Sequence, residues 1–147
     1  PENIAKSVAE FSGVHRRFEI LGNVNGITVA DDFAHHPTEL TATLNSAMSM
    51  GFRKVWGVFQ PHTFSRTYML LDDFAKALSI PDEIIISEIL PVRETNTYNI
   101  VYRKTFDEIS DYVCSHAQPG DLILTMGGGN VYMCANKIFA QLQGKNK

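Results

Sequence analysis

Two short segments of the chain concentrate side chains that could do chemistry. The first, residues 31–37, reads Asp-Asp-Phe-Ala-His-His-Pro. Its two carboxylates could accept hydrogen bonds from ribose hydroxyls or orient a Mg²⁺-bound water, and its two imidazoles could hold an amine. The same residues also suit a structural role, in which Pro37 starts a helix behind a cap and the acidic pair is solvated. From these residues alone, both interpretations stay open.

The second segment, residues 60–67, reads Gln-Pro-His-Thr-Phe-Ser-Arg-Thr and is predicted to join a strand to a helix. His62 and Arg66 are four residues apart, so they would project from one face of that helix near its N-terminus. Unpaired N–H groups and the helix dipole favour an anion there, which predicts binding of a substrate carboxylate or a phosphate. The structural alternative is an arginine that pairs with a surface acid, but the position after a strand favours the functional interpretation.

An arginine pair, Arg16 and Arg17, leads into the first predicted strand. Alternation along a strand would send the two side chains to opposite faces, so we expect at most one of them in a ligand cleft and the other in solvent. The arginine in the cleft would suit a phosphate, because a guanidinium is permanently charged and forms two parallel hydrogen bonds.

The remaining candidates are weaker. Three glycines at residues 127–129 either let a ligand approach the backbone or form a plain tight turn, and they match neither the dinucleotide fingerprint nor a phosphate-binding loop. His35, His36 and His62 lack the spacing of a zinc site, so no metal site is predicted in this chain.

Strands and helices are predicted to alternate along the chain. Asn25-Gly26, between the β-prone residues 18–23 and 27–31, predicts an antiparallel hairpin. Continuous apolar runs predict parallel strands buried on both faces, and apolar residues at helical spacing predict helices between them. The predicted strands are 55–59, 84–86 and 122–126, and the predicted helices are 2–11, the stretch between Pro37 and Gly51, 64–78, 106–113 and 131–142.

This order predicts an α/β fold, with a Rossmann-like, mainly parallel sheet, helices on both faces and an N-terminal antiparallel β-hairpin. Ligands of such sheets bind at the carboxyl ends of the strands, which is where residues 31–37 and 60–67 fall. Residues 90–101 have no clear helical or strand pattern and are predicted to form a loop at the same edge.

Composition agrees with a single soluble globular domain over residues 1–147. The mass is 16.4 kDa, with 44% hydrophobic and 20% charged residues. Thirteen Lys and Arg against 16 Asp and Glu give a net charge of -3, so neither nucleic acid nor an anionic membrane is an expected partner. The absence of a signal peptide and of an apolar run of about 18 residues predicts a cytoplasmic protein.

Two further features concern the chain as a whole. It starts with Pro1 and not Met, so we expect it to belong to a longer protein. Cys114 and Cys134 fit no metal spacing and are expected to be reduced, partly buried thiols.

Three segments in register resemble the C-terminal domain of the Mur ligase family. They are Gly-Val-His-Arg-Arg-Phe-Glu at 13–19, Asp-Asp-Phe-Ala-His-His-Pro-Thr-Glu at 31–39 and Phe-Gln-Pro-His-Thr-Phe-Ser-Arg-Thr at 59–67, and residues 119–121 and 127–130 also fit. The resemblance implies three domains in the complete protein: one for a UDP-sugar, a central ATPase with the phosphate-binding loop, and this one, which receives an amino acid. The first two would be absent from this chain, and no catalytic residue would lie in this domain alone.

The resemblance also implies roles for five residues. Arg17 matches the arginine that approaches the ATP phosphates, and Asp32 matches the aspartate that accepts hydrogen bonds from the ribose hydroxyls. His36, His62 and Arg66 fall where the amino-acid substrate is held, with Arg66 at its carboxylate.

Within the family, the chain is most similar to the branch that joins L-alanine to UDP-N-acetylmuramate. This implies that ATP phosphorylates the carboxylate of UDP-N-acetylmuramate and that the amine of L-alanine attacks the acyl phosphate. Mg²⁺ would be held mainly by the central domain, against which this domain packs. Many members of this branch have an arginine where this chain has Thr63, which leaves more of the carboxylate binding to Arg66 or calls on Arg93.

Two alternatives stay open. A branch that recycles murein tripeptide shares residues 31–37 but usually lacks the run at 60–67, which favours the alanine-adding branch. The other alternative is a stand-alone nucleotide-binding module without catalysis. An upstream phosphate-binding loop in the full reading frame would favour a ligase over such a module.

Overall fold

The computed structural model describes residues 15–94 and 105–144. The helix predicted at 2–11 and residues 95–101 of the predicted loop lie outside them. The described strands are β1 (Glu19–Val24), β2 (Ile27–Asp32), β3 (Lys54–Phe59), β4 (Glu83–Ile86) and β5 (Asp121–Met126). The described helices are α2 (Pro37–Ser49), α3 (Phe64–Met69), α4 (Leu71–Leu78), α5 (Phe106–His116) and α6 (Tyr132–Gly144). None of these helices is long and apolar enough to span a membrane.

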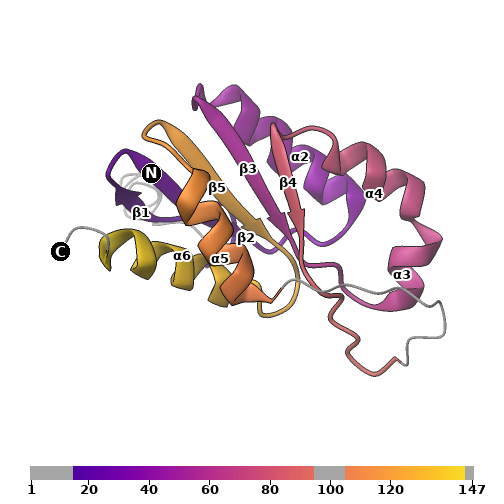
Figure 1. The fold of residues 1–147 in the computed structure, drawn as a ribbon. Coiled ribbons are helices and arrows are strands. Elements are labelled where there is room, and N and C mark those ends of the chain that lie inside the picture. Colours follow the sequence, from indigo (N-terminus) through magenta and orange to yellow (C-terminus); the bar gives the residue numbers. More distant parts are fainter. Residues whose placement is uncertain (1–14, 95–104, 145–147) are drawn as a thin grey trace, which may run out of the picture.

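The strands form one sheet with the order β1-β2-β5-β3-β4. β1 pairs antiparallel with β2, whereas β2, β5, β3 and β4 run parallel to one another. The predicted α/β fold, with its mainly parallel sheet and N-terminal hairpin, is therefore confirmed (Figure 1).

The hairpin between β1 and β2 turns at Asn25 and Gly26, as predicted. Both residues have positive φ, of 55° and 80°, which a tight hairpin requires and which Asn and Gly tolerate. The Gly26 N–H donates to the Asn23 side-chain oxygen at 3.1 Å. A Cβ at Gly26 would lie 2.9 Å from Pro119, so the turn also needs glycine for space.

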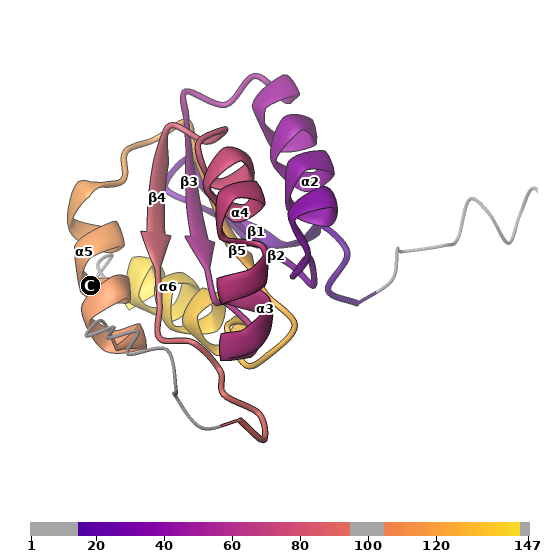
Figure 2. The ribbon, with the colours of Figure 1, turned by 90° about the vertical axis from the view of Figure 1, so that its right-hand side faces the viewer.

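Helices cover both faces of the sheet (Figures 1 and 2). α2 and α4 pack on one face, α5 and α6 pack on the other, and each pair closes a separate core. In β5, Leu122 and Leu124 belong to the first core and Ile123 to the second, because successive side chains of a strand alternate between its faces. Cys114 and Cys134 are buried in the second core, and burial raises the pKa of the Cys134 thiol to about 11.

The helix predicted at 64–78 is broken into α3 and α4. The break falls at Leu70, where φ is -112° and ψ is 23°. Tyr68 and Leu71 are 60% and 58% exposed, whereas Phe74 is buried in the core beneath α2 and α4. The change of direction lets α4 turn its apolar stripe onto the sheet, while α3 stays largely outside the core.

β4 lies at the edge of the sheet. It pairs with β3 on one side, and Ile85 is buried while Ile84 and Ile86 are half-buried. The prediction of a strand buried on both faces is therefore wrong for this element, because an edge strand is covered less completely than a central one.

The carboxyl ends of the four parallel strands meet at one edge of the sheet. Backbone hydrogen bonds of 2.9–3.1 Å continue past the strand ends and tie each following segment to the neighbouring strand. They run from the Gly127 N–H to the Asp32 carbonyl, from the Gln60 N–H to the Met126 carbonyl and from the Ser87 N–H to the Phe59 carbonyl. The segments that carry the predicted site residues are thereby held at this edge.

Candidate functional site

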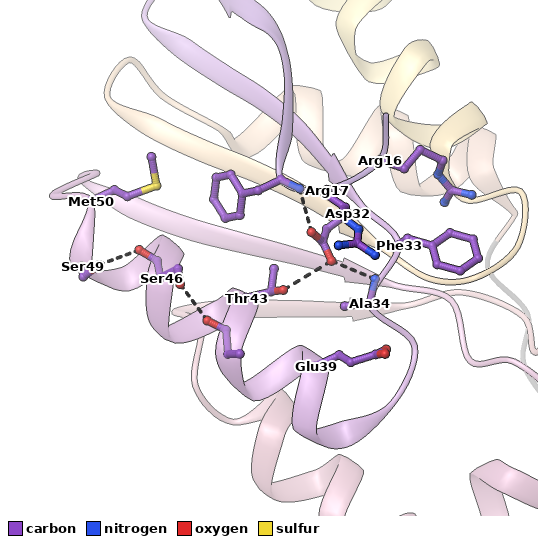
Figure 3. A pocket seen from close by; sticks show the side chains of 12 residues that line it. Arg16, Arg17, Asp32, Phe33, Ala34, Glu39, Thr43, Ser46, Ser49 and Met50 are labelled. Carbon is purple, nitrogen blue, oxygen red and sulfur yellow. Dashed lines mark hydrogen bonds between the residues drawn. The ribbon is translucent and has the colours of Figure 1, made fainter. Parts of the chain in front are cut away.

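An open groove with a volume of about 700 Å³ lies beside the end of β2 and is called here the β2 groove (Figure 3). It runs between the turn at residues 16–18, the residues that follow β2, and helix α2. Two of the five predicted site residues, Arg17 and Asp32, line it. The other lining residues are Arg16, Phe18, Phe33, Ala34, Glu39, Ala42, Thr43, Ser46, Ser49 and Met50.

Asp32 is held by three hydrogen bonds from its surroundings. Its Oδ2 accepts from the Phe18 N–H at 2.7 Å, and its Oδ1 accepts from the Ala34 N–H at 2.8 Å and the Thr43 hydroxyl at 3.3 Å. Asp31 and Asp32 are only 2% and 9% exposed, so the alternative of a solvated acidic pair is wrong. Because a carboxylate has about four acceptor positions, Asp32 keeps one for a ligand donor such as a hydroxyl.

The Arg16 guanidinium is bound within the chain. Nε donates to Asp31 Oδ2 at 2.7 Å, and Nη1 and Nη2 donate to the carbonyls of Gly129 and Gly127 at 2.8 Å each. The guanidinium also lies over the Phe33 ring, 5.1 Å from its centroid. Arg16 therefore ties the turn before β1 to the end of β2 and to the glycine segment after β5.

Arg17 is exposed, and its side chain lies beside Asp32 in the β2 groove (Figure 3). Arg16 and Phe18 have positive φ, of 59° and 45°, so residues 16–18 form a turn and not a strand. The two arginines do have different environments, but strand alternation is not the cause. The expectation that one arginine is merely solvated is wrong, because Arg16 is bound internally and Arg17 lines the groove.

His36 is the N-cap of α2, and this confirms the structural interpretation of that residue. Its Nδ1 accepts the Thr38 N–H at 3.3 Å, while the Glu39 carboxylate accepts the N–H groups of His35 and His36 at 3.0 and 3.1 Å. The hydrogen bond from His35 is the main cause that lowers the pKa of Glu39. His36 lines a different hollow, of about 480 Å³ between α2 and α4, and is not brought into the β2 groove.

His62 and Arg66 form a second group, the His62–Arg66 cluster. His62 precedes α3 and pairs with Leu90 in an isolated parallel bridge, so the prediction that both side chains leave one helical face is wrong. Burial, the Arg66 charge and the nearby His35, 5.8 Å away between ring centroids, lower the pKa of His62. His62 Nδ1 and Arg66 Nη1 are buried, and neither has a hydrogen-bond partner in the part of the chain described. The cluster therefore combines an imidazole whose neutral form is favoured with a guanidinium that has a spare buried donor.

The start of α3, where an anion was predicted, is occupied by Glu94. The Ser65 N–H donates to Glu94 Oε2 at 2.9 Å, and the Ser65 hydroxyl donates to Oε1 at 2.6 Å. These hydrogen bonds, that of the hydroxyl most of all, lower the pKa of Glu94. Glu94 was not among the predicted site residues. The available clue was that the first turn of α3 contains no acidic residue, so its N–H groups need an acceptor from elsewhere.

The glycine segment serves close packing within the chain. A Cβ at Gly129 would lie 2.4 Å from Leu90 Cδ2 and 2.7 Å from Gln60 Oε1. A Cβ at Gly127 would lie 2.9 Å from the Gln60 carbonyl oxygen. The close approach to the backbone at Gly127 favours glycine there. At Gly129 a side chain would have to displace Leu90 and Gln60, so internal packing accounts for these two glycines.

The structure sorts the five predicted residues into three places. Arg17 and Asp32 share the β2 groove, His62 and Arg66 share a cluster, and His36 caps α2. Within residues 15–94 and 105–144, no group of three or more His, Cys, Asp or Glu side chains could hold a metal ion.

A comparison with protein families decides the family. The model described as "Mur ligase, glutamate ligase domain" matches residues 16–129, a range that contains all five predicted site residues. The chain belongs to the Mur ligase family. The matched range begins at the turn that carries Arg16 and Arg17 and ends in the glycine segment, so both the β2 groove and the His62–Arg66 cluster lie within the Mur ligase domain.

Individual relatives agree with this family. The UDP-N-acetylmuramate–L-alanine ligase of Alkaliphilus metalliredigens is 44% identical over 156 residues, which cover 96% of this chain and 34% of that protein. The solved UDP-N-acetylmuramate-alanine ligase of Thermotoga maritima matches with a TM-score of 0.75 at 24% identity, over 95% of this chain and 33% of its own. The solved murein peptide ligase of Psychrobacter arcticus matches with a TM-score of 0.61 at 24% identity, over 93% and 32%. The solved structures agree with the fold, and this chain spans about a third of the length of each of these proteins.

Proposed function

We propose that this Mur ligase domain, residues 1–147, is the C-terminal domain of an ATP-dependent ligase that joins L-alanine to UDP-N-acetylmuramate in peptidoglycan synthesis. The remaining domains, for the UDP-sugar and for ATP hydrolysis, would belong to the rest of a longer bacterial protein in the cytoplasm. The 44% identical relative, which carries the name of the alanine-adding enzyme, favours this function over murein-tripeptide recycling.

The observation that carries the proposal is a pair of buried nitrogen atoms, His62 Nδ1 and the donor Arg66 Nη1, which have no hydrogen-bond partner among the described residues. A buried donor without an acceptor costs about 1–3 kcal/mol, and a carboxylate at this position would remove that cost. Arg66 supplies a permanent positive charge, which makes its hydrogen bonds to a carboxylate strong. The lowered pKa of His62 favours its neutral form, in which one ring nitrogen can accept a hydrogen bond from an amine. The two residues together suit the two ends of an amino acid.

The β2 groove suits the nucleotide. Its volume of about 700 Å³ lies in the range of small-molecule sites, roughly 300–1,000 Å³. The remaining acceptor position of Asp32 suits a ribose hydroxyl, and the exposed Arg17 guanidinium suits the phosphates. His36 stays a proposed contact of the amino acid, although its ring nitrogen already caps α2.

ATP, when bound, supplies the phosphoryl group that activates the carboxylate of UDP-N-acetylmuramate. The resemblance to the family assigns Mg²⁺ mainly to the central domain. This domain would pack against the central domain, exclude water from the acyl phosphate and orient the amine of L-alanine for attack. It thus positions both substrates and has no catalytic residue of its own.

Arg66→Ala in the full-length enzyme tests the proposal. We expect the KM for L-alanine to rise about 10- to 100-fold, which corresponds to the loss of one charge-assisted hydrogen bond of roughly 1.5–3 kcal/mol. The KM for ATP should stay within about twofold. Arg17→Ala should instead raise the KM for ATP and leave the KM for L-alanine within about twofold. Phosphate release is measured with L-alanine or with the murein tripeptide as acceptor. Equal effects of Arg66→Ala on both KM values, or turnover with the tripeptide alone, would contradict the assignment.

A further inference from the structure

Backbone hydrogen bonds join the segment from Glu88 to Glu94 to the residues that precede α3. The Leu90 N–H donates to the Pro61 carbonyl, and the Thr63 N–H donates to the Leu90 carbonyl, both at 2.9 Å. These two hydrogen bonds flank His62 and form its bridge with Leu90. The backbone on either side of His62 therefore follows the position of this segment.

Glu94 extends this attachment into the first turn of α3. Its two carboxylate oxygens accept separately from the Ser65 N–H and the Ser65 hydroxyl. Thr63, the N-cap residue, makes no side-chain cap hydrogen bond. Within the described part of the chain, Glu94 is thus the side chain that caps this helix.

Besides this attachment, α3 is held by Thr67, its one buried residue, whose hydroxyl donates to the Thr63 carbonyl at 2.7 Å. It has six residues, fewer than an isolated helix needs to be stable in water. Its Tyr68 and Met69 side chains are 60% and 78% exposed, so packing fixes it only weakly. Arg66 directly follows Ser65, and a change at the start of α3 would move its guanidinium.

We propose that Glu94 is a positioning residue of the amino-acid site. The hydrogen bonds that it accepts from Ser65 hold Arg66 and His62 where they meet the incoming carboxylate and amine. The inference rests on the proposed function. Glu94 also occupies the N–H and hydroxyl donors at the start of α3. A substrate carboxylate is therefore directed to Arg66 and away from the helix end.

The test uses Glu94→Ala and Glu94→Gln in the full-length enzyme. We expect the KM for L-alanine to rise about tenfold in Glu94→Ala and about fivefold in Glu94→Gln, because a small displacement of binding groups weakens substrate positioning. Glutamine can still accept one hydrogen bond from Ser65, which explains the smaller effect. The KM for ATP should stay within about twofold. The matched control is Glu88→Gln, which removes an exposed carboxylate from the same segment and should change neither KM.

Hydrogen exchange of the peptide that covers residues 62–70 is a second readout, independent of activity. If Glu94→Gln exchanges faster than both the wild type and Glu88→Gln, the hydrogen bonds between Ser65 and Glu94 hold the start of α3. Unchanged exchange overturns the proposal. An unchanged KM for L-alanine, or equal increases in both KM values, also overturns it. If the wild-type enzyme shows no L-alanine-dependent phosphate release, the proposed function fails, while the exchange measurement still decides whether Glu94 holds α3.

Discussion

The β2 groove and the His62–Arg66 cluster lie at the same edge of one sheet but are prepared for ligands in different ways. In the groove, internal hydrogen bonds fix Asp32 and Arg16, and the nearby Arg17 is exposed. In the cluster, buried nitrogen atoms of His62 and Arg66 have no partner among the described residues. Under the proposed function, the groove would be complete before the nucleotide binds, whereas the amino acid would complete the cluster.

Arg16→Ala tests whether the groove is built in advance and is expected to have the largest effect. The substitution leaves the buried Asp31 carboxylate without its cation and the carbonyls of Gly127 and Gly129 without donors. Removing one partner of a buried ion pair costs about 3–5 kcal/mol, so the free energy of unfolding should fall by about that amount. Urea denaturation of the 147-residue chain measures it.

Arg17→Ala is the matched control, because the neighbouring arginine is exposed. Its free energy of unfolding should stay within about 0.5 kcal/mol of the wild type. Similar losses in both variants would show that the two arginines share one structural role, and the contrast drawn for the groove would fail.

Thr63→Gly tests whether the backbone beside His62 is strained. Its expected effect on the free energy of unfolding is smaller than that of Arg16→Ala. Thr63 has φ of 67° and ψ of 144°, a backbone conformation that is costly for a β-branched residue, by about 1–3 kcal/mol. Glycine adopts it without strain but adds about 1 kcal/mol of entropy cost in the unfolded chain. We therefore expect Thr63→Gly to be more stable than the wild type, by up to about 2 kcal/mol, in urea denaturation. Thr63→Ala keeps the Cβ and should gain nothing, so equal stabilities of the two variants would refute stored strain at this position.

The titration of His62 tests whether its imidazole is coupled to Arg66, and its expected effect is the smallest. Its pKa is lowered from 6.5, chiefly by burial and then by Arg66, so the folded protein should bind fewer protons at His62 than the unfolded chain just below pH 6.5. The free energy of unfolding should consequently have its full His62 contribution above pH 6.5 and decrease as the pH falls through the lower, folded pKa. NMR of the imidazole should give a midpoint below 6.5 in the wild type. Arg66→Ala should raise that midpoint, and a midpoint that does not move would mean that the two side chains are not coupled.

Local sequence patterns predicted most of the fold. Asn25 and Gly26 specify a hairpin by their own backbone preferences, and the continuous apolar runs of β3 and β5 identify strands that are buried on both faces. The parallel topology then places the ends of β2 and β3 at one edge without further information. The same reasoning places Asp32 at this edge, whereas the choice of Arg17 over Arg16 depends on the resemblance to the family.

The remaining site features depend on contacts between residues distant in sequence. Arg16 differs from Arg17 because carbonyl groups more than 100 positions away accept hydrogen bonds from its guanidinium. Glu94 reaches Ser65 from 29 positions away, out of a segment without helical or strand periodicity. The break at Leu70 follows from which side of α4 meets the sheet. None of these contacts leaves a periodic pattern in the sequence.

The strand order has a consequence for how the molecule assembles. β5, the last strand along the chain, lies between β2 and β3, which are made much earlier. A nascent chain emerging from the ribosome therefore has a gap in the middle of its sheet until Met126 has been synthesised. β2 and β3, already paired with β1 and β4, gain their shared partner only about 90 and 70 positions later. Such long-range pairing is slow to form, so truncation before this strand would leave two incomplete halves with unpaired edges that invite aggregation.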